Sequence, residues 1–359
     1  AGGFLVKSTS LLAPANATPG NLGIILSANG NIGLLTVKRG HVPQAVGINL
    51  GIARFFEFEH ANNADLNLTA QLRYFDALLN GNTVFGLGFW RQDSAFWFNP
   101  PLSGLDVATN TATVNNINLL TRMTLGAEVP KVAAKVLLEG PYSTVNGSMN
   151  DGLRSGNLVP TKSPYQAPSY NFGSGAATES VNPFVFTTTT NDAIVDWVFV
   201  ALRDASTGNT IISARSALMQ RDGDIVDLDG KSALSFPGIV PGNNYYLSFR
   251  HRNHLGIRTL NTATFTANAT ALDFTTSNSL VIGGANALAQ MSDGKFALFS
   301  GDFNADGQIQ VGGDLNGLIP TLGQSGYLSG DVDLNGQVQN NEVQAILTPN
   351  LGRGAQYTY

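Results

Sequence analysis

The stretch Ala53-Arg-Phe-Phe-Glu-Phe-Glu-His60 contains alternating apolar and charged side chains. In an extended strand, successive side chains point to opposite faces. Phe56 and Phe58 would therefore share one face of a strand, and Glu57 and Glu59 the other. This pattern predicts a strand with one buried face and one face in water.

Similar runs recur through the first part of the chain, separated by turns rich in Gly and Asn; they are residues 21–29, 34–40 and 68–79. Repeated strands with turn signals between them are typical of a β-sandwich. A second strand-rich block lies between about residues 192 and 300, and it includes a hairpin turn at Ser206-Thr-Gly-Asn209. We expect a mainly β protein with two β-sandwich domains of immunoglobulin-like or jelly-roll-like type in series. Their expected bounds are 1–128 and 129–300, and a long irregular segment, 140–182, leads into the second.

The composition excludes several functional classes. Of the 359 residues, 13% are charged and 40 are Gly, whereas ordinary globular proteins have about 25% charged residues. The formal charge of −5 contains no basic cluster, which argues against nucleic-acid binding. No apolar run approaches the ~20 residues of a membrane-spanning helix. The chain has no Cys, so disulfides, iron–sulfur clusters, thiolate zinc sites and a Cys nucleophile are excluded.

The last part of the chain, residues 301–359, differs because Asp and Asn gather in two short loops that begin 29 residues apart. Each loop has oxygen-bearing side chains at positions 1, 3 and 5 and a Gly at position 6. The candidate ligands of the first loop are Asp302, Asn304, Asp306, Gln308 and Asp314. Those of the second loop are Asp331, Asp333, Asn335, Gln337 and Glu342.

This arrangement predicts Ca²⁺ binding. Ca²⁺ takes 6–8 oxygen ligands, and alternate residues of a coiled loop converge on it when a Gly at position 6 permits the sharp turn. Gln308 and Gln337 would contribute backbone carbonyls, and Glu342 at position 12 would contribute both carboxylate oxygens. The first loop departs from the pattern, because its position 12 is Gly313 and the carboxylate of Asp314 comes one residue later. The alternative is a pair of Asx-turns, which Asp, Asn and Gly form in many loops. Short helices are expected after the loops, in 314–322 and 340–351.

Three other groups of residues are weaker candidates. The run 221–230 carries four carboxylates that could hold a further cation, although such runs are more often solvated turns. His251 and His254 could form a zinc or catalytic pair, but a strand would place them on opposite faces, so a hydrogen-bonded structural role is favoured. A sugar could bind an aromatic platform, although core positions are more common for aromatic residues; its members would be Trp90, Trp97 and Trp197 with Phe89, Phe96 and Phe98. The loops near Tyr165 and Tyr170 are a further candidate for contact with a carbohydrate or protein ligand.

The segment from Phe4 to Leu12 is apolar at both ends. We expect it to be the first strand of the chain's own sandwich. The alternative is a strand that completes the sheet of a neighbouring subunit through main-chain hydrogen bonds.

No nucleophile elbow, phosphate loop, dinucleotide fingerprint or zinc-protease helix is present in the sequence, and we expect no catalytic residues. A paired-carboxylate hydrolase is the alternative that the sequence leaves open, because such partners meet only in the fold.

Several segments resemble the C-terminal regions of large secreted surface proteins of Bacteroidota-type bacteria, of hemagglutinin- or adhesin-like character. These segments are residues 73–81, 133–142, 149–165, 191–204, 216–230, 245–257 and 301–310. The two terminal loops are similar to the duplicated calcium loops of dockerins. The resemblance implies a secreted bacterial protein located at the cell surface or in the surrounding matrix, and a dockerin-like calcium module at 301–359.

Taken together, these patterns predict a non-catalytic, calcium-stabilised structural or adhesive protein outside the cell. It would self-associate as a homo-oligomer or a filament through β-strand contacts. The alternative is an adhesin module that binds a carbohydrate or a cell-surface protein without self-assembly. The sequence does not identify the residues that would bind such a ligand.

Overall fold

The computed structural model describes residues 3–46, 49–64, 66–93, 96–166, 172 and 178–359. The protein is mainly β, with 39% strand and 14% helix, and the strand pairs of its principal sheets are antiparallel except for β13 (Lys131–Lys135) with β23 (Thr270–Asp273). The chain forms two compact units: Ala1–Pro130 with Pro237–Pro241, and Lys131–Phe236 with Gly242–Tyr359. The terminal segment 301–359 thus belongs to the same unit as the strands that precede it.

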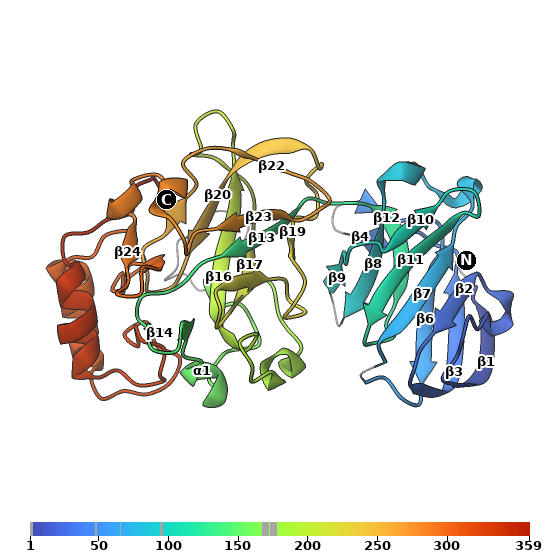
Figure 1. Ribbon diagram of the computed structural model, residues 1–359, viewed down its shortest axis with the longest axis horizontal. Coiled ribbons are helices and arrows are strands. Elements are labelled where there is room, and N and C mark those ends of the chain that lie inside the picture. The colour runs from blue at the N-terminus through green and yellow to red at the C-terminus, as the bar shows by residue number, and fades with distance from the viewer. Residues whose placement is uncertain (1–2, 47–48, 65, 94–95, 167–171, 173–177) are drawn as a thin grey trace. The chain divides into compact units, whose positions relative to one another are not determined.

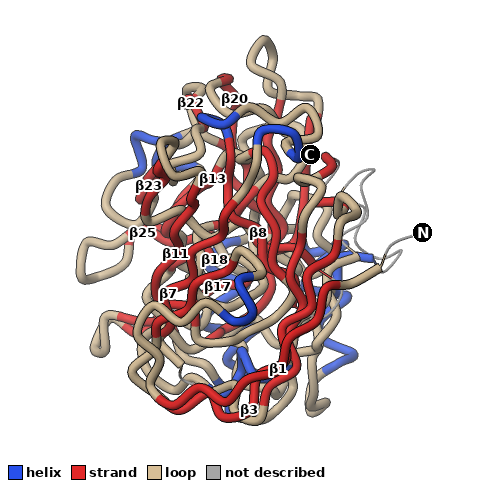
Figure 2. The backbone as a smooth tube through the Cα atoms, turned by 90° about the vertical axis from the view of Figure 1, so that its right-hand side faces the viewer, coloured by secondary structure: helices blue, strands red, loops and turns tan. Residues whose placement is uncertain are grey.

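The first unit contains a six-stranded and a four-stranded antiparallel sheet (Figures 1 and 2). The six-stranded sheet has the order β1 (Leu5–Leu12), β3 (Asn31–Gly40), β6 (Phe55–His60), β12 (Met123–Ala127), β8 (Leu87–Asp93) and β9 (Phe96–Phe98). The four-stranded sheet has the order β10 (Gly104–Asp106), β11 (Thr111–Ile117), β7 (Leu68–Arg73) and β2 (Ile24–Ser27). A short pair, β4 (Ala45–Val46) and β5 (Asn49–Leu50), and three 3₁₀ turns complete the unit: η1 (Pro19–Asn21), η2 (Asp76–Leu78) and η3 (Val84–Gly86).

One hydrophobic core joins the two sheets of this unit. It takes Val37 and Phe56 from the six-stranded sheet and Ile24 and Leu72 from the four-stranded sheet, each no more than 2% exposed. Phe58 packs against the same core. The alternation in 53–60 is therefore confirmed as a strand with one apolar face toward the core, which is the arrangement that its period of two predicts.

The second unit is built on a nine-stranded sheet. Its main path has the order β19 (Leu234–Ser235), β13 (Lys131–Lys135), β18 (Asp224–Val226), β17 (Ile211–Gln220), β16 (Ile194–Arg203), β20 (Asn243–Arg250) and β21 (Ile257–Arg258). Two further strands pair off this path: β22 (Ala263–Phe265) with β20, and β23 (Thr270–Asp273) with β13. Two small hairpins accompany the sheet: β14 (Tyr142–Ser143) with β15 (Ser148–Met149), and β24 (Leu288–Gln290) with β25 (Phe296–Leu298).

The predicted hairpin of this unit is confirmed as β16 and β17, with Gly208 at φ +70° in the connection. The carboxylate of Asp204 holds that turn by accepting hydrogen bonds from the backbone N–H groups of Ser206, Thr207 and Thr210. All ten residues of β16 are buried. A strand buried on both faces has no alternation of apolar and polar residues, which is why Ile194–Arg203 reads as a continuous apolar run interrupted by Asp196.

The remaining helices are short. They are α1 (Gly152–Ser155), the 3₁₀ turns η4 (Pro164–Gln166), η5 (Pro183–Thr187), η6 (Asn278–Leu280) and η7 (Gly284–Asn286), and those of the terminal segment. The short helices expected at the ends of the two Asp-rich loops are confirmed. In the first half, η8 (Val311–Leu315) begins within the loop and is followed by α2 (Asn316–Leu318) and η9 (Ile319–Thr321); in the second half, η10 (Glu342–Leu347) begins at the loop's last residue and is followed by η11 (Thr348–Asn350).

Candidate metal centre

The two Asp-rich loops, 302–314 (the first loop) and 331–342 (the second loop), have the same backbone conformation. Position 4 is left-handed in both, with φ +56° at Ala305 and +59° at Leu334. Position 6 has φ +90° at both Gly307 and Gly336. A left-handed non-glycine residue costs free energy, and its occurrence at the same place in both loops indicates a duplicated, specifically coiled structure.

The duplicated halves also pair reciprocally. Ile309, which follows the first loop's glycine, accepts a hydrogen bond from the backbone N–H of Gly352 at 2.8 Å. Val338 in the second loop accepts the equivalent bond from Gly323, also at 2.8 Å. Ile309 and Val338 are fully buried in one core cluster. Each loop is therefore held by the segment that follows the helix of the other half.

The second loop gathers three carboxylates. One oxygen each from Asp331, Asp333 and Glu342 lies within 4.8 Å of the other two, the one such group among the described residues. Asp331 and Glu342 are fully buried. Glu342 Oε2 accepts a hydrogen bond from the backbone N–H of Gln339 at 2.7 Å, whereas Glu342 Oε1 is buried without a hydrogen-bond partner. An unpartnered buried carboxylate oxygen is costly, and a cation at this point would satisfy it.

The carboxylates of the second loop are wholly or partly buried and repel one another. Burial, with a smaller contribution from Asp333, raises the pKa of Asp331 to about 7 against the opposing effect of Arg252. Burial and the charge of Asp333 also raise the pKa of Glu342 to about 7. Without a cation the loop therefore holds its ionised carboxylates at a cost in free energy, and the charge of a divalent cation would offset both burial and repulsion.

The other predicted residues of the second loop stabilise its coil. The Asn335 backbone N–H donates to Asp331 Oδ1 at 3.0 Å, and Asn335 Oδ1 accepts from the backbone N–H of Gln337 at 2.9 Å. The Gln337 side chain is exposed and bonds to Gln339, which leaves its backbone carbonyl as the candidate ligand. The bonds between residues two apart are those of Asx-turns, so both interpretations from sequence describe part of the loop. Asx-turns do not account for the burial of Glu342.

In the first loop, Asp314 takes the place that Glu342 has in the second. Asp314 is fully buried, and its oxygens accept hydrogen bonds from the backbone N–H groups of Asn304 at 3.2 Å and Gln310 at 2.7 Å. Gln310 is the position-9 counterpart of Gln339. Although the Asp side chain is one methylene shorter than Glu and comes one residue later, these hydrogen bonds place its carboxylate in the loop. Burial, with the nearby charges of Asp314 and Asp306, raises the pKa of Asp302 to about 8.

Gly313, at position 12 of the first loop, lies against the candidate ligands. A Cβ there would be 2.8 Å from Asn304 Nδ2 and 3.9 Å from Asp306 Oδ2. Asn304 Nδ2 itself donates to Asp306 Oδ2 at 2.9 Å. The glycine therefore leaves room for these two side chains.

The second loop rests on the irregular segment 140–152 of the second unit. Leu153 N–H donates to Leu334 O at 3.1 Å. A Cβ at Gly140 would lie 1.9 Å from Val332 O, and one at Gly152 would lie 2.8 Å from Leu334 O. Only glycine permits backbones to approach this closely, so the segment 140–152 is shaped to the loop.

His251 and His254 belong to a buried polar network. The strand β20 ends at Arg250, so the expected placement of the two histidines on opposite faces is wrong: their rings lie 5.0 Å apart, with Nδ1 atoms 3.2 Å from each other. Arg252 Nε donates to Asp196 Oδ2 at 2.8 Å, and Tyr327 OH donates to Asp196 Oδ1 at 2.6 Å. These contacts favour the structural role that was expected for this run.

That network joins β16 to the terminal segment. Burial opposes ionisation of Asp196, but the charges and hydrogen bonds of Arg252, His251 and Tyr327 hold its pKa below the ordinary value. Asn253 Nδ2 donates to Ser329 O at 3.0 Å and to Asp331 O at 2.8 Å. The backbone of the second loop is therefore anchored to the core of the second unit.

The carboxylates of 221–230 already have partners. Asp222 pairs with Lys135 at 2.7 Å, and Asp227 pairs with Arg215 at 2.6 Å while accepting from Ser235 Oγ at 2.7 Å. These contacts favour a structural role over a cation site.

Burial agrees with the core positions that were favoured for most of the candidate aromatic platform, including Phe89 and Phe98. Trp90 and Trp197 are fully buried, and Tyr165 is 4% exposed. Trp97 is half-buried against a core cluster. Tyr170 lies outside the described residues.

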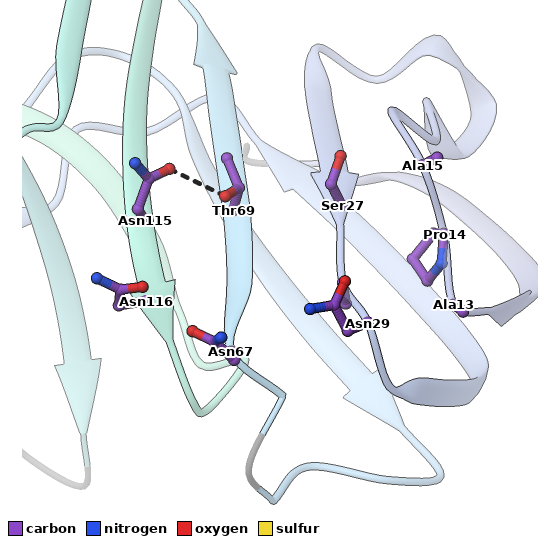
Figure 3. A pocket seen from close by; sticks show the side chains of 10 residues that line it. Ala13, Pro14, Ala15, Ser27, Asn29, Asn67, Thr69, Asn115 and Asn116 are labelled. Carbon is purple, nitrogen blue, oxygen red and sulfur yellow. Dashed lines mark hydrogen bonds between the residues drawn. The ribbon is translucent and has the colours of Figure 1, made fainter.

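A hollow of about 610 Å³ was not predicted from the sequence (Figure 3). It lies over β2, β7 and β11 of the first unit, where Ser27, Thr69 and Asn115 form a row on adjacent strands. Its lining has no charged side chain and consists of Ala13, Pro14, Ala15, Ser27, Ala28, Asn29, Asn67, Thr69, Asn115 and Asn116. The doublet Asn115-Asn116 inside a strand pattern was the available signal, because Asn is uncommon in strand interiors.

Comparison with known proteins returned no matching family model, no matching curated protein and no matching solved structure. Within the described residues, no helix has both the length and the apolar character needed to cross a membrane.

Proposed function

We propose that this chain is a non-catalytic structural or adhesive protein outside the cell that binds Ca²⁺ in its two Asp-rich loops. In this proposal the units are built on β-sandwich domains and the terminal segment is a dockerin-like calcium module. The observation that carries the metal site is the buried, unpartnered Glu342 Oε1 beside the carboxylates of Asp331 and Asp333.

The donor set favours Ca²⁺ over other metals. The candidate ligands are carboxylate, amide and backbone oxygens, which are hard donors suited to Ca²⁺, whereas zinc prefers nitrogen and sulfur. Mg²⁺ demands near-octahedral geometry and keeps several waters. A coiled loop that offers alternate oxygens and a carboxylate at its end supplies the larger and more flexible shell that Ca²⁺ takes.

The test is thermal unfolding in calcium and in chelator. Ca²⁺ at a hundred times its dissociation constant would stabilise the fold by about 2.7 kcal/mol. We expect Asp331→Ala and Glu342→Ala to lower the melting temperature in calcium and to leave it unchanged in chelator. Gln337→Ala is the matched control, because that residue would act through its backbone carbonyl, and we expect it to keep the full calcium effect. Equal losses in both conditions would show that the loop is held by something other than metal.

The extracellular and structural parts of the proposal rest on composition and metal supply. Extracellular modules bind Ca²⁺ with dissociation constants of about 10⁻⁴–10⁻³ M, which are matched to the calcium outside cells. A low charge and a high Gly content suit an extended β surface. Light scattering and negative-stain microscopy with calcium and with chelator test assembly: regular particles support a structural subunit, and monomers in both conditions contradict it.

The second candidate function is carbohydrate binding in the hollow of Figure 3. Amide and hydroxyl groups both donate and accept hydrogen bonds, so an uncharged lining of this type suits a neutral polyhydroxyl ligand. The register shifts between Val114 and Ile117, which places both Asn115 and Asn116 opposite Thr69, with Asn116 at φ +58°. Such a bulge re-aims side chains and is common at functional sites.

Glycine substitutions test this second candidate because they keep a left-handed backbone. We expect Asn67→Gly and Asn116→Gly to abolish retention on a panel of neutral polysaccharides. Asn110→Gly is the control, since Asn110 is also left-handed at φ +52° but does not line the hollow. Equal retention of all three variants, or no retention of the unaltered protein, would rule the hollow out as a sugar site.

A further inference from the structure

The edge strand β1 exposes apolar side chains on both of its faces. Phe4 is 45% exposed, Leu5 46%, Val6 55% and Leu12 70%, and Leu34 on the adjacent strand β3 is 60% exposed. In β1 only Leu11 packs against the core of the first unit. The strand therefore contributes main-chain hydrogen bonds to its own sheet but leaves these apolar side chains exposed, although the Phe4 ring also contacts Phe55 edge-on.

The outer edge of β1 is long and carries no further strand among the described residues, although η1 packs against β1 at Lys7, where a Cβ at Gly20 would lie 2.7 Å from Lys7 Cβ. β1 pairs with β3 along its whole length, from Leu5 opposite Arg39 to Leu12 opposite Asn31, and no other strand of the described chain pairs with it (Figure 2). The other edges of the two main sheets in this unit are shorter, with three residues each in β9 and β10 and four in β2. Long edge strands with apolar side chains and no proline are sites of strand addition.

The sequence of this edge is self-complementary. In an antiparallel pair of identical strands with the same faces up, residues of the same parity lie opposite each other. A pair centred on Ser8 places Leu5 opposite Leu11 and Phe4 opposite Leu12. Lys7, the one charged residue between Phe4 and Leu12, then lies opposite Thr9 rather than another lysine. Apolar residues thus meet at both ends and small polar residues at the centre.

The face pattern agrees with this register. Odd-numbered residues of β1 lie opposite residues of β3 that point to the core, such as Val37 and Leu35. Even-numbered residues of β1 lie opposite residues of β3 on the outer face of the sheet. Ser8 Oγ and Thr36 Oγ1 form a 2.8 Å hydrogen bond on that outer face. A two-fold axis normal to the sheet at Ser8 keeps the outer faces of both copies on one side.

We propose that β1 is the self-association surface of this protein, pairing antiparallel with β1 of a second copy about Ser8. This inference rests on the structural role in the proposed function, which requires assembly, and names the strand through which two copies would associate. A symmetric pair of this kind closes as a dimer, so any filament requires a further contact elsewhere.

Single-cysteine variants test the register directly, because the chain has no Cys of its own. In the proposed pair, Ser8 faces Ser8 of the second copy with Cα atoms about 5 Å apart, which is within disulfide range. Ser10 is on the same face and equally exposed, but it would lie about 13 Å along the strand from its counterpart. We expect Ser8→Cys to form disulfide-linked dimers at least ~10 times faster than Ser10→Cys under mild oxidation.

A second pair of measurements guards against chance cross-linking. Val6→Lys with Leu12→Lys would bring four lysines to the shared edge, and we expect this variant to be monomeric by light scattering where the unaltered chain is dimeric. Both side chains are exposed, so we expect the variant to fold, which circular dichroism checks. Phe85→Lys is the control, because Phe85 is 87% exposed in η3 and away from β1, and it should remain dimeric.

The outcomes separate this inference from the proposed function. A monomeric unaltered chain, or equal cross-linking at positions 8 and 10, overturns the β1 pairing. Filaments that persist in the Val6→Lys, Leu12→Lys variant would keep the structural function and still overturn the pairing as its contact. If the protein forms dimers that cross-link at position 8 but no filaments, the β1 pairing is supported and only filament assembly is contradicted.

Discussion

At the scale of single residues, the carboxylates of the two loops make the metal-free protein sensitive to pH. A raised pKa in the folded state means that the fold tolerates the protonated acid better than the ion. These groups contribute stability to the folded state below about pH 4, which is their pKa in the unfolded chain. That stability is lost as the pH rises through 7 for Asp331 and Glu342 and through 8 for Asp302. Bound Ca²⁺ requires the ions and reverses the preference.

The difference in melting temperature between calcium and chelator should therefore grow from pH 5 to pH 8. The comparison uses the difference between the two melting temperatures because other groups also titrate in this range. Burial lowers the pKa of His251 and His254, so the stability that they contribute is lost in calcium and in chelator alike as the pH falls below about 6.5. A difference that is constant across this range would mean that the loop carboxylates do not titrate with metal binding.

Two adjacent glycines of the first loop give a matched comparison. A Cβ at Gly313 would crowd the side chain of Asn304, whereas a Cβ at Gly312 would meet nothing within 4 Å. We expect Gly313→Ala to weaken calcium binding at one site of two, measured by calorimetry, and Gly312→Ala to bind normally and to be more stable by up to about 1 kcal/mol. Equal calcium affinity in the two variants would remove Asn304 from the ligand set.

At the scale of secondary-structure elements, β16 and the terminal segment are joined through one carboxylate. Tyr327→Phe removes the hydroxyl that donates to the buried Asp196, and we expect it to cost about 1–3 kcal/mol in denaturant unfolding. Tyr142→Phe is the control, since its hydroxyl makes a bond of the same 2.6 Å length to Asp293, which is exposed. A loss of similar size in both variants would mean that burial of the acceptor does not set the cost.

At the scale of the whole molecule, the packing of the second loop on 140–152 gives calcium a wider effect than its own loops. Gly140, Gly152 and Leu153 lie against that loop, and all belong to the same compact unit as β16 and β20. Hydrogen exchange should show slower exchange in calcium for β16 and β20, and no change for β3 and β6 of the first unit. Protection confined to 301–359 would mean that the terminal segment opens independently.

The sequence predicted local structure well, but it did not predict which distant residues of the chain contact one another. Alternation predicted β6, and loop spacing predicted the coils with Gly307 and Gly336, because both patterns depend on residues a few positions apart. The sequence left Asp314 in doubt, since only the fold brings its carboxylate to the N–H groups of Asn304 and Gln310. His251 and His254 were misplaced because nothing local marks the end of β20 at Arg250.

The sequence by itself therefore determined the mainly β character of this protein, the turns that separate its strands and the duplicated Asp-rich loops. Tertiary structure alone decided that Asp196 meets Arg252, that Gly140 lies under the second loop, and that β1 is an edge strand. The physical reason is the range of the forces involved. Backbone conformation and side-chain periodicity are set between near neighbours, whereas burial and charge pairing depend on which distant segments share a core.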